Sequence, residues 1–508
     1  MGLNGPGRVK APEHTGTAVA EARIAMAQPY LEPCDRGVIE AQPCPRKLGR
    51  EIEPKRRRWI LVACILASSM AFIDGSALTV ALPNLRDDFG VDFASVQWVV
   101  NGYVLALASF TLIGGALADV YGKARMLTIG CVGFGIASIA CAIAPSPFIL
   151  VIARIVQGVM AAIVTPSSLA LIGATFPETE RNRAIGIWAA ASALTTAGGP
   201  ILGGWLTQTF GWQAVFWINP PLATAAVATL VAFAAKDRLE ERQFDVTGAI
   251  ILAFALATLA WLFSDIGPGE SDSVGDNFVT SGVTTALVGV VGFASLIAYA
   301  VWERTTAHPM TPPRLFANRP FTGLNAATLL IYGALSIMFF LLPFELVDRR
   351  GLSPIEAGLV FLPFTLGLGL LSQLFGSLAD KVGSRTPLIA GSIGASIAYA
   401  LMAGLRDAPL WLGTIAPMAV LGVAFALLVA PLTGAVMSSV GKKDEGLASG
   451  MNNAASRIAQ LVGVSIAAGM LSYETGYAIG LTIAAVTSAG GAFVVAFTVP
   501  SLSKYTLG

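Results

Sequence analysis

The stretch GALADVYGKAR, Gly115 to Arg125, returns 261 positions later as GSLADKVGSRT, Gly376 to Thr386. Five positions coincide at the same spacing: Gly115/Gly376, Leu117/Leu378, Ala118/Ala379, Asp119/Asp380 and Gly122/Gly383. Each copy begins at the end of a long apolar run and finishes in a short basic loop. The first glycine of each copy, Gly115 or Gly376, is expected to allow a facing helix to come close. A repeat this far apart predicts two related halves, each with one copy near the end of its second membrane helix.

The composition predicts an all-α integral membrane protein. Of the 508 residues, 55% are hydrophobic and 12% are charged, and the mean hydropathy is +0.70. Several apolar stretches run for about 20 residues or more, which is enough to cross a hydrocarbon core of roughly 30 Å. The alternating strands of a membrane barrel are not seen, so the spans must be helices.

Fourteen apolar stretches predict fourteen spans, which the repeat divides into two halves. They lie at about 59–82, 97–118, 126–144, 148–172, 184–207, 213–234, 246–264, 281–302, 321–346, 355–379, 387–404, 411–437, 448–472 and 477–499. Removing the seventh and eighth leaves six plus six, with one copy of the repeat in the second helix of each half. We therefore expect a disordered cytoplasmic tail without a signal peptide (1–54), a six-helix half (55–240), a two-helix insertion (241–303) and a second six-helix half (304–508).

The distribution of Lys and Arg predicts the orientation in the membrane. An even number of spans puts both termini on one side. With that side assigned to the cytoplasm, the inner segments next to the spans hold 19 basic residues and the outer loops hold four, Arg86, Arg349, Arg350 and Arg406. The positive-inside rule therefore favours cytoplasmic termini in a cell (inner) membrane.

Two opposite charges are expected to lie at similar depth in the first half. Asp74, in FIDGSALTVALP (72–83), is the only carboxylate of the first span and lies roughly 13 Å from its outer end. Arg154, in LVIARIVQGVMAA (150–162) with Gln157, lies roughly 9 Å from the outer end of the fourth span. We expect Arg154 to face Asp74 and to stabilise its ionised form. A static salt bridge or a snorkelling arginine is the structural alternative.

Three further stretches carry candidate functional residues. In TTAGGPILGGWL (195–206), Gly199, Pro200, Gly203 and Gly204 predict a kinked helix that packs closely on a neighbour. In GMNNAASRIAQLVG (450–463), Arg457 belongs to a polar stripe with Asn452, Asn453 and Gln460, where it could pair with an acid or contact an anionic group.

Glu345, near the outer end of the ninth span, either attracts cationic substrates or is a solvated glutamate at a loop edge; the second interpretation is favoured. Trp212 and Trp217 are expected to anchor the sixth span at the membrane interface.

Together, the repeated loop, these signatures and the fourteen spans resemble the major facilitator superfamily, most closely its fourteen-helix drug:proton antiporter family, over residues 59–500. The resemblance implies a conformational latch at Gly115, Asp119, Gly122, Lys123, Arg125, Gly376, Asp380 and Gly383. Val120 and Ala124 stand where the family usually has basic residues. The resemblance also makes Asp74, Arg154, Gln157 and Arg457 candidates for proton coupling or substrate binding, and the pattern around Pro200 marks export.

The leading functional hypothesis is a proton-coupled exporter of amphipathic drugs or toxic small molecules, cationic ones included, that works by alternating access. The expected partners are the substrate, protons and the bilayer, without nucleic acid; further efflux components are unknown. No cofactor is expected, because Gly122-Lys123 lacks the spacing of a nucleotide-binding loop. The chain has two histidines, His14 and His308, and its cysteines lack C-x-x-C spacing. Both observations argue against a metal site and against an enzyme. An exporter of an endogenous lipid or metabolite, or a passive facilitator or importer, remain alternatives.

Overall fold

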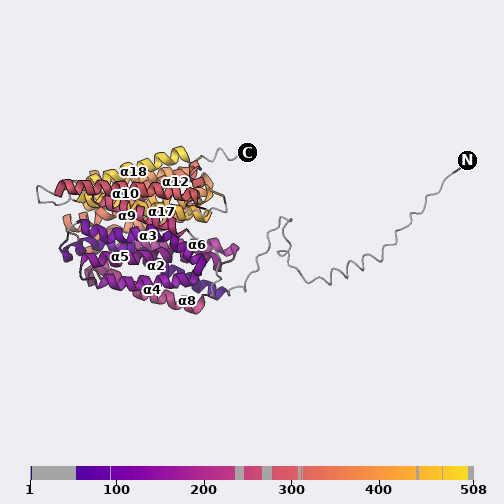
Figure 1. Cartoon of the computed structure of the whole chain (residues 1–508). Coiled ribbons are helices and arrows are strands. Elements are labelled where there is room, and N and C mark those ends of the chain that lie inside the picture. Colours follow the sequence, from indigo (N-terminus) through magenta and orange to yellow (C-terminus); the bar gives the residue numbers. More distant parts are fainter. Residues whose placement is uncertain are drawn as a thin grey trace. The chain divides into compact units, whose positions relative to one another are not determined.

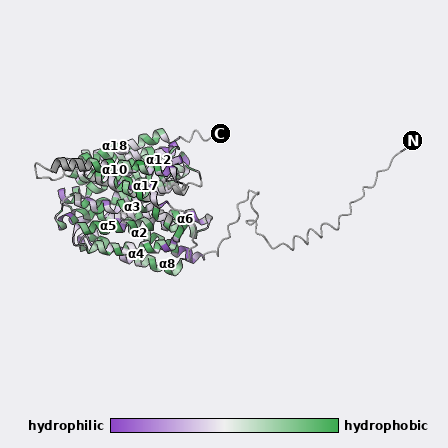
Figure 2. Ribbon diagram, viewed as in Figure 1, coloured by the Kyte–Doolittle hydropathy of each residue, from purple (hydrophilic) through white to green (hydrophobic). Residues whose placement is uncertain are grey.

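The computed structural model describes residues 2, 53–91, 93–234, 245–265, 277–306, 311, 313–441, 445–471 and 473–500, and every regular element in these segments is a helix (Figure 1). The prediction of a disordered tail at 1–54 falls almost wholly outside the described residues. Hydrophobic residues cover most of the helices along their length (Figure 2). An all-α membrane protein is therefore what the chain forms.

The helices follow the predicted spans in order. The first part holds α2 (Pro54–Phe89), α3 (Phe93–Tyr121), α4 (Lys123–Ala142), α5 (Pro147–Thr175), α6 (Glu178–Phe210), α7 (Ala214–Trp217), α8 (Asn219–Phe233), α9 (Val246–Asp265) and α10 (Asn277–Thr305). The second part holds α11 (Pro313–Phe316), α12 (Arg319–Phe344), the π-helix η1 (Glu345–Arg349), α13 (Pro354–Val360), α14 (Leu362–Val382), α15 (Arg385–Gly404), the π-helix η2 (Trp411–Ile415), α16 (Ala416–Ser438), α17 (Glu445–Leu471) and α18 (Gly476–Thr498).

Eleven helices in the described segments are long and apolar enough to cross a membrane. Helices also form at the three remaining predicted stretches, as α3, α6 and α9. The sixth, tenth and twelfth stretches are each built from two consecutive helical pieces: α7 with α8, α13 with α14, and η2 with α16. A multi-pass membrane protein is thus established, while the number of fourteen spans stays a prediction.

The same packing pattern occurs twice. In the first part, α2 packs on α6 and α8, α5 packs on α3 and α4, and α4 packs on α8. In the second part, α12 packs on α17 and α18, α16 packs on α14 and α15, and α15 packs on α18. These are the same pairings by position in each set of six. The domain boundaries at 240 and 303 stay predictions.

A smaller set of contacts joins the two sets of six. Helix α3 packs on α17, α6 packs on α13 and α14, and α2 packs on α12. Helix α9 packs on both α3 and α17 and carries α10 on it (Figure 1). The inserted pair therefore contacts both sets of helices beside the contact between α3 and α17.

The loop glycines of the repeat share one backbone conformation. Gly122, before α4, has φ 100°, and Gly383, after α14, has φ 81°. Side chains on L-residues disfavour these angles, so glycine is needed to turn the chain tightly at both places. This part of the repeat therefore has a geometric cause.

The close helix approach expected at the first glycine of the repeat lies one residue earlier. A β-carbon built at Gly115 would be 3.5 Å from Cβ of Pro166, an ordinary contact, whereas one at Gly114 would be 2.2 Å from the carbonyl oxygen of Ala162. Gly376 likewise has its nearest neighbour, Cβ of Ala430, at 3.5 Å. The expectation that Gly115 and Gly376 bring a facing helix close is therefore wrong in position, because Gly114 makes that contact with α5.

This difference predicts opposite outcomes for two adjacent substitutions. Gly114→Ala forces α3 away from α5 and should cost about 1–3 kcal/mol, lowering the midpoint of thermal unfolding in detergent. Gly115→Ala should leave the midpoint unchanged or raise it slightly, because alanine favours the helix. Equal destabilisation by both variants would contradict the packing described.

Candidate functional site

Asp74 lies at the centre of a buried polar network between α2, α5 and α8. Its side chain is 0% exposed. Oδ1 accepts hydrogen bonds from Nε2 of Gln157 at 2.9 Å and from Nδ2 of Asn219 at 3.0 Å, while Oδ2 accepts one from Nη1 of Arg154. The contact between Arg154 and Asp74 that their depths predicted is present. Three side-chain donors therefore satisfy the hydrogen-bonding capacity of this buried carboxylate.

The guanidinium of Arg154 is also buried and has several bonding partners. It is 1% exposed, and its Nε donates to the carbonyl oxygen of Val99 at 3.0 Å. Its guanidinium carbon lies 4.2 Å from the ring centroid of Tyr103 and 5.6 Å from that of Phe216. Both rings stabilise the cation through their π-electrons. A guanidinium fixed on three sides cannot snorkel to the membrane surface, so the pair is an internal one.

A second layer of side chains orients the network. Nε2 of Gln157 also donates to Oγ of Ser138 at 2.8 Å, and Oε1 of Gln157 accepts from Arg154 at 2.6 Å. The hydroxyl of Tyr103 donates to the carbonyl oxygen of Ala71, one turn before Asp74, at 3.0 Å. Sequence reasoning missed Asn219, Tyr103 and Ser138. They lie on three other spans, and no local spacing connects them to Asp74.

The glycines around Pro200 pack α6 against two partners. A β-carbon at Gly199 would lie 1.8 Å from Oγ of Ser76, and one at Gly203 would lie 2.1 Å from the carbonyl oxygen of Ala77. Gly204 faces Pro354 of α13 in the same way, at 2.2 Å. The predicted close packing is confirmed, while the kink at Pro200 stays a prediction. Helix α6 thus touches the turn that follows Asp74 and also the second set of helices.

A group of contacts, here called the Arg86 cluster, joins the two sets at the end of the bundle where α2 meets α3. Nη1 of Arg86 lies 2.7 Å from Oδ2 of Asp348 in η1. Its guanidinium carbon lies 5.0 Å from the ring centroid of Phe93 and 5.8 Å from that of Phe344, and these rings contact edge to face. Nearby, Oε1 of Gln208 accepts from the backbone N–H of Ile355 at 3.1 Å. These contacts join the two sets of helices at this end of the bundle.

Glu345 is enclosed by arginines next to the Arg86 cluster. It is 5% exposed, with Nη1 of Arg349 at 2.5 Å, Nη2 of Arg406 at 2.8 Å and Nε of Arg350 at 4.0 Å. The prediction of a solvated glutamate at a loop edge is therefore wrong. These arginines neutralise the charge of Glu345. Glu345 is therefore not free to attract a cationic substrate.

The residues of the proposed latch are only partly described. Asp119 and Asp380 lie within α3 and α14, but their side chains fall outside the described structure. Lys123 begins α4, and Arg125 is exposed in its first turn. The latch between helix ends stays a prediction.

Arg457 lies in α17, away from the Asp74 network. Its Nη1 donates to Oε1 of Gln460 at 2.9 Å, and the phenols of Tyr103 and Tyr332 interact with it electrostatically. Asn452, on the same helix, accepts a hydrogen bond from Thr328 of α12 at 2.6 Å. The structure thus places Arg457 apart from Asp74, with Tyr103 as a shared neighbour.

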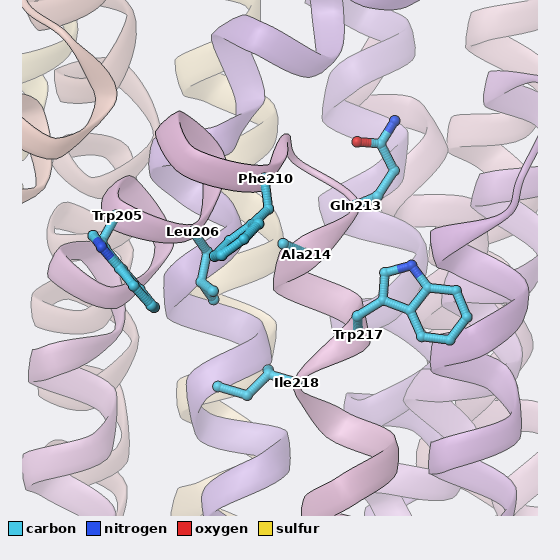
Figure 3. Close-up of a pocket in the computed structure, with 7 residues that line it drawn as sticks. All are labelled: Trp205, Leu206, Phe210, Gln213, Ala214, Trp217 and Ile218. Atoms are coloured by element: carbon cyan, nitrogen blue, oxygen red, sulfur yellow. The ribbon is translucent and has the colours of Figure 1, made fainter.

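A separate pocket lies between the end of α6 and the start of α8, with a cavity volume of about 650 Å³. Figure 3 shows its lining: Trp205, Leu206, Phe210, Gln213, Ala214, Trp217 and Ile218. Trp217 is half exposed, as expected of an interface anchor, but Trp212 is buried and donates to Asp88 at 2.8 Å. The anchor prediction is therefore wrong for Trp212.

The described residues contain no group of three His, Cys, Asp or Glu side chains that could hold a metal ion.

Comparison with known proteins decides the family. The model of the Major Facilitator Superfamily matches residues 64–318 and 324–506. The chain belongs to the major facilitator superfamily. It shares its fold with the peptide transporter POT in complex with sulfate (TM-score 0.64, 16% identity, 88% of this chain and 95% of that one) and with a D-xylose-proton symporter (TM-score 0.59, 14% identity, 87% and 98%).

Several curated relatives of the chain are drug-resistance proteins by name. The multidrug resistance protein Stp of Mycobacterium tuberculosis is 32% identical over 81% of this chain and 75% of its own length. The lincomycin resistance protein of Streptomyces lincolnensis is 32% identical over 82% and 85%. The tetracenomycin C resistance and export protein of Streptomyces glaucescens is 29% identical over 83% and 77%. The chain is accordingly a membrane transporter and not an enzyme.

The enclosure of Asp74 and Arg154 predicts a large stability cost for neutralising either one. Asp74→Asn and Arg154→Gln should each destabilise the protein by about 3–5 kcal/mol, because the remaining charge stays buried without a partner. The double variant should be more stable than either single one. Thermal unfolding in detergent measures all three.

Glu180→Gln is the matched control for removing a charge. Glu180 pairs with Arg57 at 3.2 Å, but its side chain is 57% exposed. Its loss should cost under about 1 kcal/mol. Additive losses in the Asp74→Asn/Arg154→Gln double variant would show that the two residues act independently and would contradict the pairing.

Proposed function

We propose that the chain is a proton-coupled exporter of amphipathic drugs or toxic small molecules, which exchanges substrate for protons by alternating access. The proposal places it in a cell (inner) membrane with both termini in the cytoplasm, and with two six-helix halves separated by an inserted pair. The drug-resistance and export activities named for its relatives support the substrate class and direction. The Asp74–Arg154 network supports the proton coupling.

Protonation of Asp74 is the proposed coupling step. It removes the counter-charge of Arg154, which is fully buried, and a buried charge that loses its partner costs about 3–5 kcal/mol. The helices lower this cost by moving so that water reaches the guanidinium. One proton crossing a potential of 100 mV supplies about 2.3 kcal/mol before any pH gradient. The potential alone therefore supplies about half of this cost per proton, so the pH gradient must contribute to biasing the conformations.

The network also holds an acceptor for the added proton. Oδ1 of Asn219 is buried and has no hydrogen-bond partner among the described residues, while its Nδ2 donates to Asp74 at 3.0 Å. Rotation of the amide by half a turn would place Oδ1 where Nδ2 lies. A protonated Asp74 would then donate to Asn219. The amide thus serves both protonation states of the acid.

The Arg86 cluster is the proposed closure on the outer side. Opening to the outside requires the Arg86–Asp348 ion pair and the α6–α13 contact at Gly204 to separate. The repeated loops, with Asp119 and Asp380, are proposed to hold the cytoplasmic side when the outer side opens. Each side is then closed by contacts that the other conformation breaks.

Two alternatives predict different transport behaviour. An exporter of an endogenous lipid or metabolite would leave drug susceptibility unchanged when its gene is deleted. A facilitator or importer would not accumulate drug against a gradient in everted vesicles. The names of the curated relatives favour the drug exporter over both.

Everted vesicles test the function directly. Energised vesicles that contain the chain should accumulate tetracenomycin C, the compound named for one relative, several-fold over vesicles without it, and an uncoupler should abolish the difference. Asp407→Asn, an acid-to-amide change at a carboxylate that is 85% exposed, should behave like the parent. Unchanged accumulation after uncoupling would contradict proton coupling.

Linking the two partners of the outer ion pair tests alternating access. In a cysteine-free background, Arg86→Cys/Asp348→Cys joined by a short bis-maleimide should retain substrate binding but lose more than about 90% of transport, because the outer side cannot open. Each single cysteine variant, treated identically, should keep its transport. Full transport by the linked protein would contradict a moving closure at this end.

A further inference from the structure

Arg457 is a membrane-embedded cation at the contact between the two sets of helices. It lies 12 residues into α17, roughly 18 Å from the start of that helix. Helix α17 packs on α12 of its own set and on α3 of the other. The neighbours of its guanidinium come from both, as Tyr332 and Tyr103. A ligand bound to Arg457 would therefore touch both sets.

Arg457 has no counter-charge among the described residues. Its guanidinium donates a hydrogen bond to the neutral amide of Gln460, and no described carboxylate forms an ion pair with it. Asp74 is already bonded to three donors, and Glu345 is surrounded by arginines at the other end of α12. A charge in this position is costly for a membrane protein unless it serves a ligand or a transport path.

The charges of Asp74, Arg154 and Arg457 therefore sum to a positive value. Asp74 and Arg154 cancel, while Arg457 is not neutralised. This balance opposes the binding of a cation and favours a group with negative charge. A planar guanidinium can donate two parallel hydrogen bonds to a carboxylate, and the phenols of Tyr103 and Tyr332 lie near enough to Arg457 to interact with it electrostatically.

We propose that Arg457 is the substrate-binding guanidinium and that it selects molecules with an anionic oxygen group, such as a carboxylate or phenolate, over cationic ones. The inference rests on the proposed export function and narrows its substrate class. It replaces the expectation of cationic substrates, whose candidate attractor, Glu345, is neutralised by Arg349 and Arg406.

An anionic substrate is compatible with the direction of export. A negative charge that leaves a cell with a negative interior gains about 2.3 kcal/mol per 100 mV. The substrate does not compete with the proton for one carboxylate, because Arg457 and Asp74 are separate groups with Tyr103 between them. The opening of one side of the protein at a time then couples export to proton entry. Substrate and proton do not have to compete for the same carboxylate.

Binding of two xanthene dyes to the full-length protein in detergent tests the charge preference. Fluorescein carries a carboxylate and a phenolate, whereas rhodamine 123 has a related ring system with a positive charge. Fluorescence polarisation should show fluorescein binding at least about ten-fold more tightly. Benzoate should displace fluorescein, and benzylamine should not. Preference for rhodamine 123, or no fluorescein binding, would overturn the proposal.

Variants then assign the preference to Arg457. Arg457→Gln should weaken fluorescein binding at least about ten-fold without weakening rhodamine 123 binding, and Arg457→Lys should fall between the parent and Arg457→Gln. Arg304→Gln, the same change at an exposed position of α10, should bind both dyes like the parent. Unchanged fluorescein affinity in monodisperse Arg457→Gln would overturn the proposal. If Arg457→Gln does not fold, the fluorescein affinity of Arg457→Lys and the displacement of fluorescein by benzoate still test the proposal.

Failure of this inference and failure of the export function give different results. Proton-driven accumulation of a relative's drug, together with a preference for rhodamine 123, would reject only the role of Arg457. Absence of energised accumulation of every compound, with fluorescein still binding through Arg457, would reject the export function and leave the binding site in place.

Discussion

The structure depends on one buried ion pair, Asp74 with Arg154. A carboxylate and a guanidinium at zero and one per cent exposure are tolerated inside a membrane protein only when each is fully bonded. Helix α2 supplies the acid, α5 supplies the arginine and Gln157, and α8 supplies Asn219. The aromatic surface on the guanidinium comes from Tyr103 and Phe216. The positions of these helices are therefore constrained by the need to satisfy two charges.

The same constraint connects the acid to the surfaces that move. Helix α6 packs against Ser76 and Ala77, which directly follow Asp74, and through Gly204 it also touches Pro354 of the second set. Tyr103 contacts Arg154 and interacts electrostatically with Arg457. A change of charge at Asp74 thus reaches the contact between the two sets by two short routes. Each route from Asp74 to the contact between the two sets passes through at most one intervening side chain or helix turn.

Much of the fold was predictable because membrane spans are long, continuous and apolar. The fourteen predicted stretches all became helices, and the repeated loop predicted the duplicated packing pattern. The Asp74–Arg154 contact was predictable because two charges at equal depth in a bilayer have few other partners. Asn219 and Tyr103 could not be found, because a single asparagine or tyrosine in an apolar run gives no signal of which helix it faces.

The errors have physical causes of the same kind. Glu345 was expected in solvent because it lies near a span end, but arginines from two neighbouring segments enclose it. Gly115 was expected to lie at a close helix contact because it is repeated. The side of α3 that packs on α5 instead carries Gly114, so the close contact is at Gly114. In both cases three-dimensional neighbours, which sequence spacing does not encode, decided the outcome.

The central claim is that protonation of Asp74 couples the proton gradient to transport. Proteoliposomes with parent protein or Asp74→Asn, matched for monodisperse protein, test it through two readouts: exchange of labelled for unlabelled drug without a gradient, and accumulation driven by an imposed pH gradient. The account predicts that Asp74→Asn keeps exchange but loses the gradient-driven accumulation. Accumulation by Asp74→Asn equal to that of the parent would contradict it.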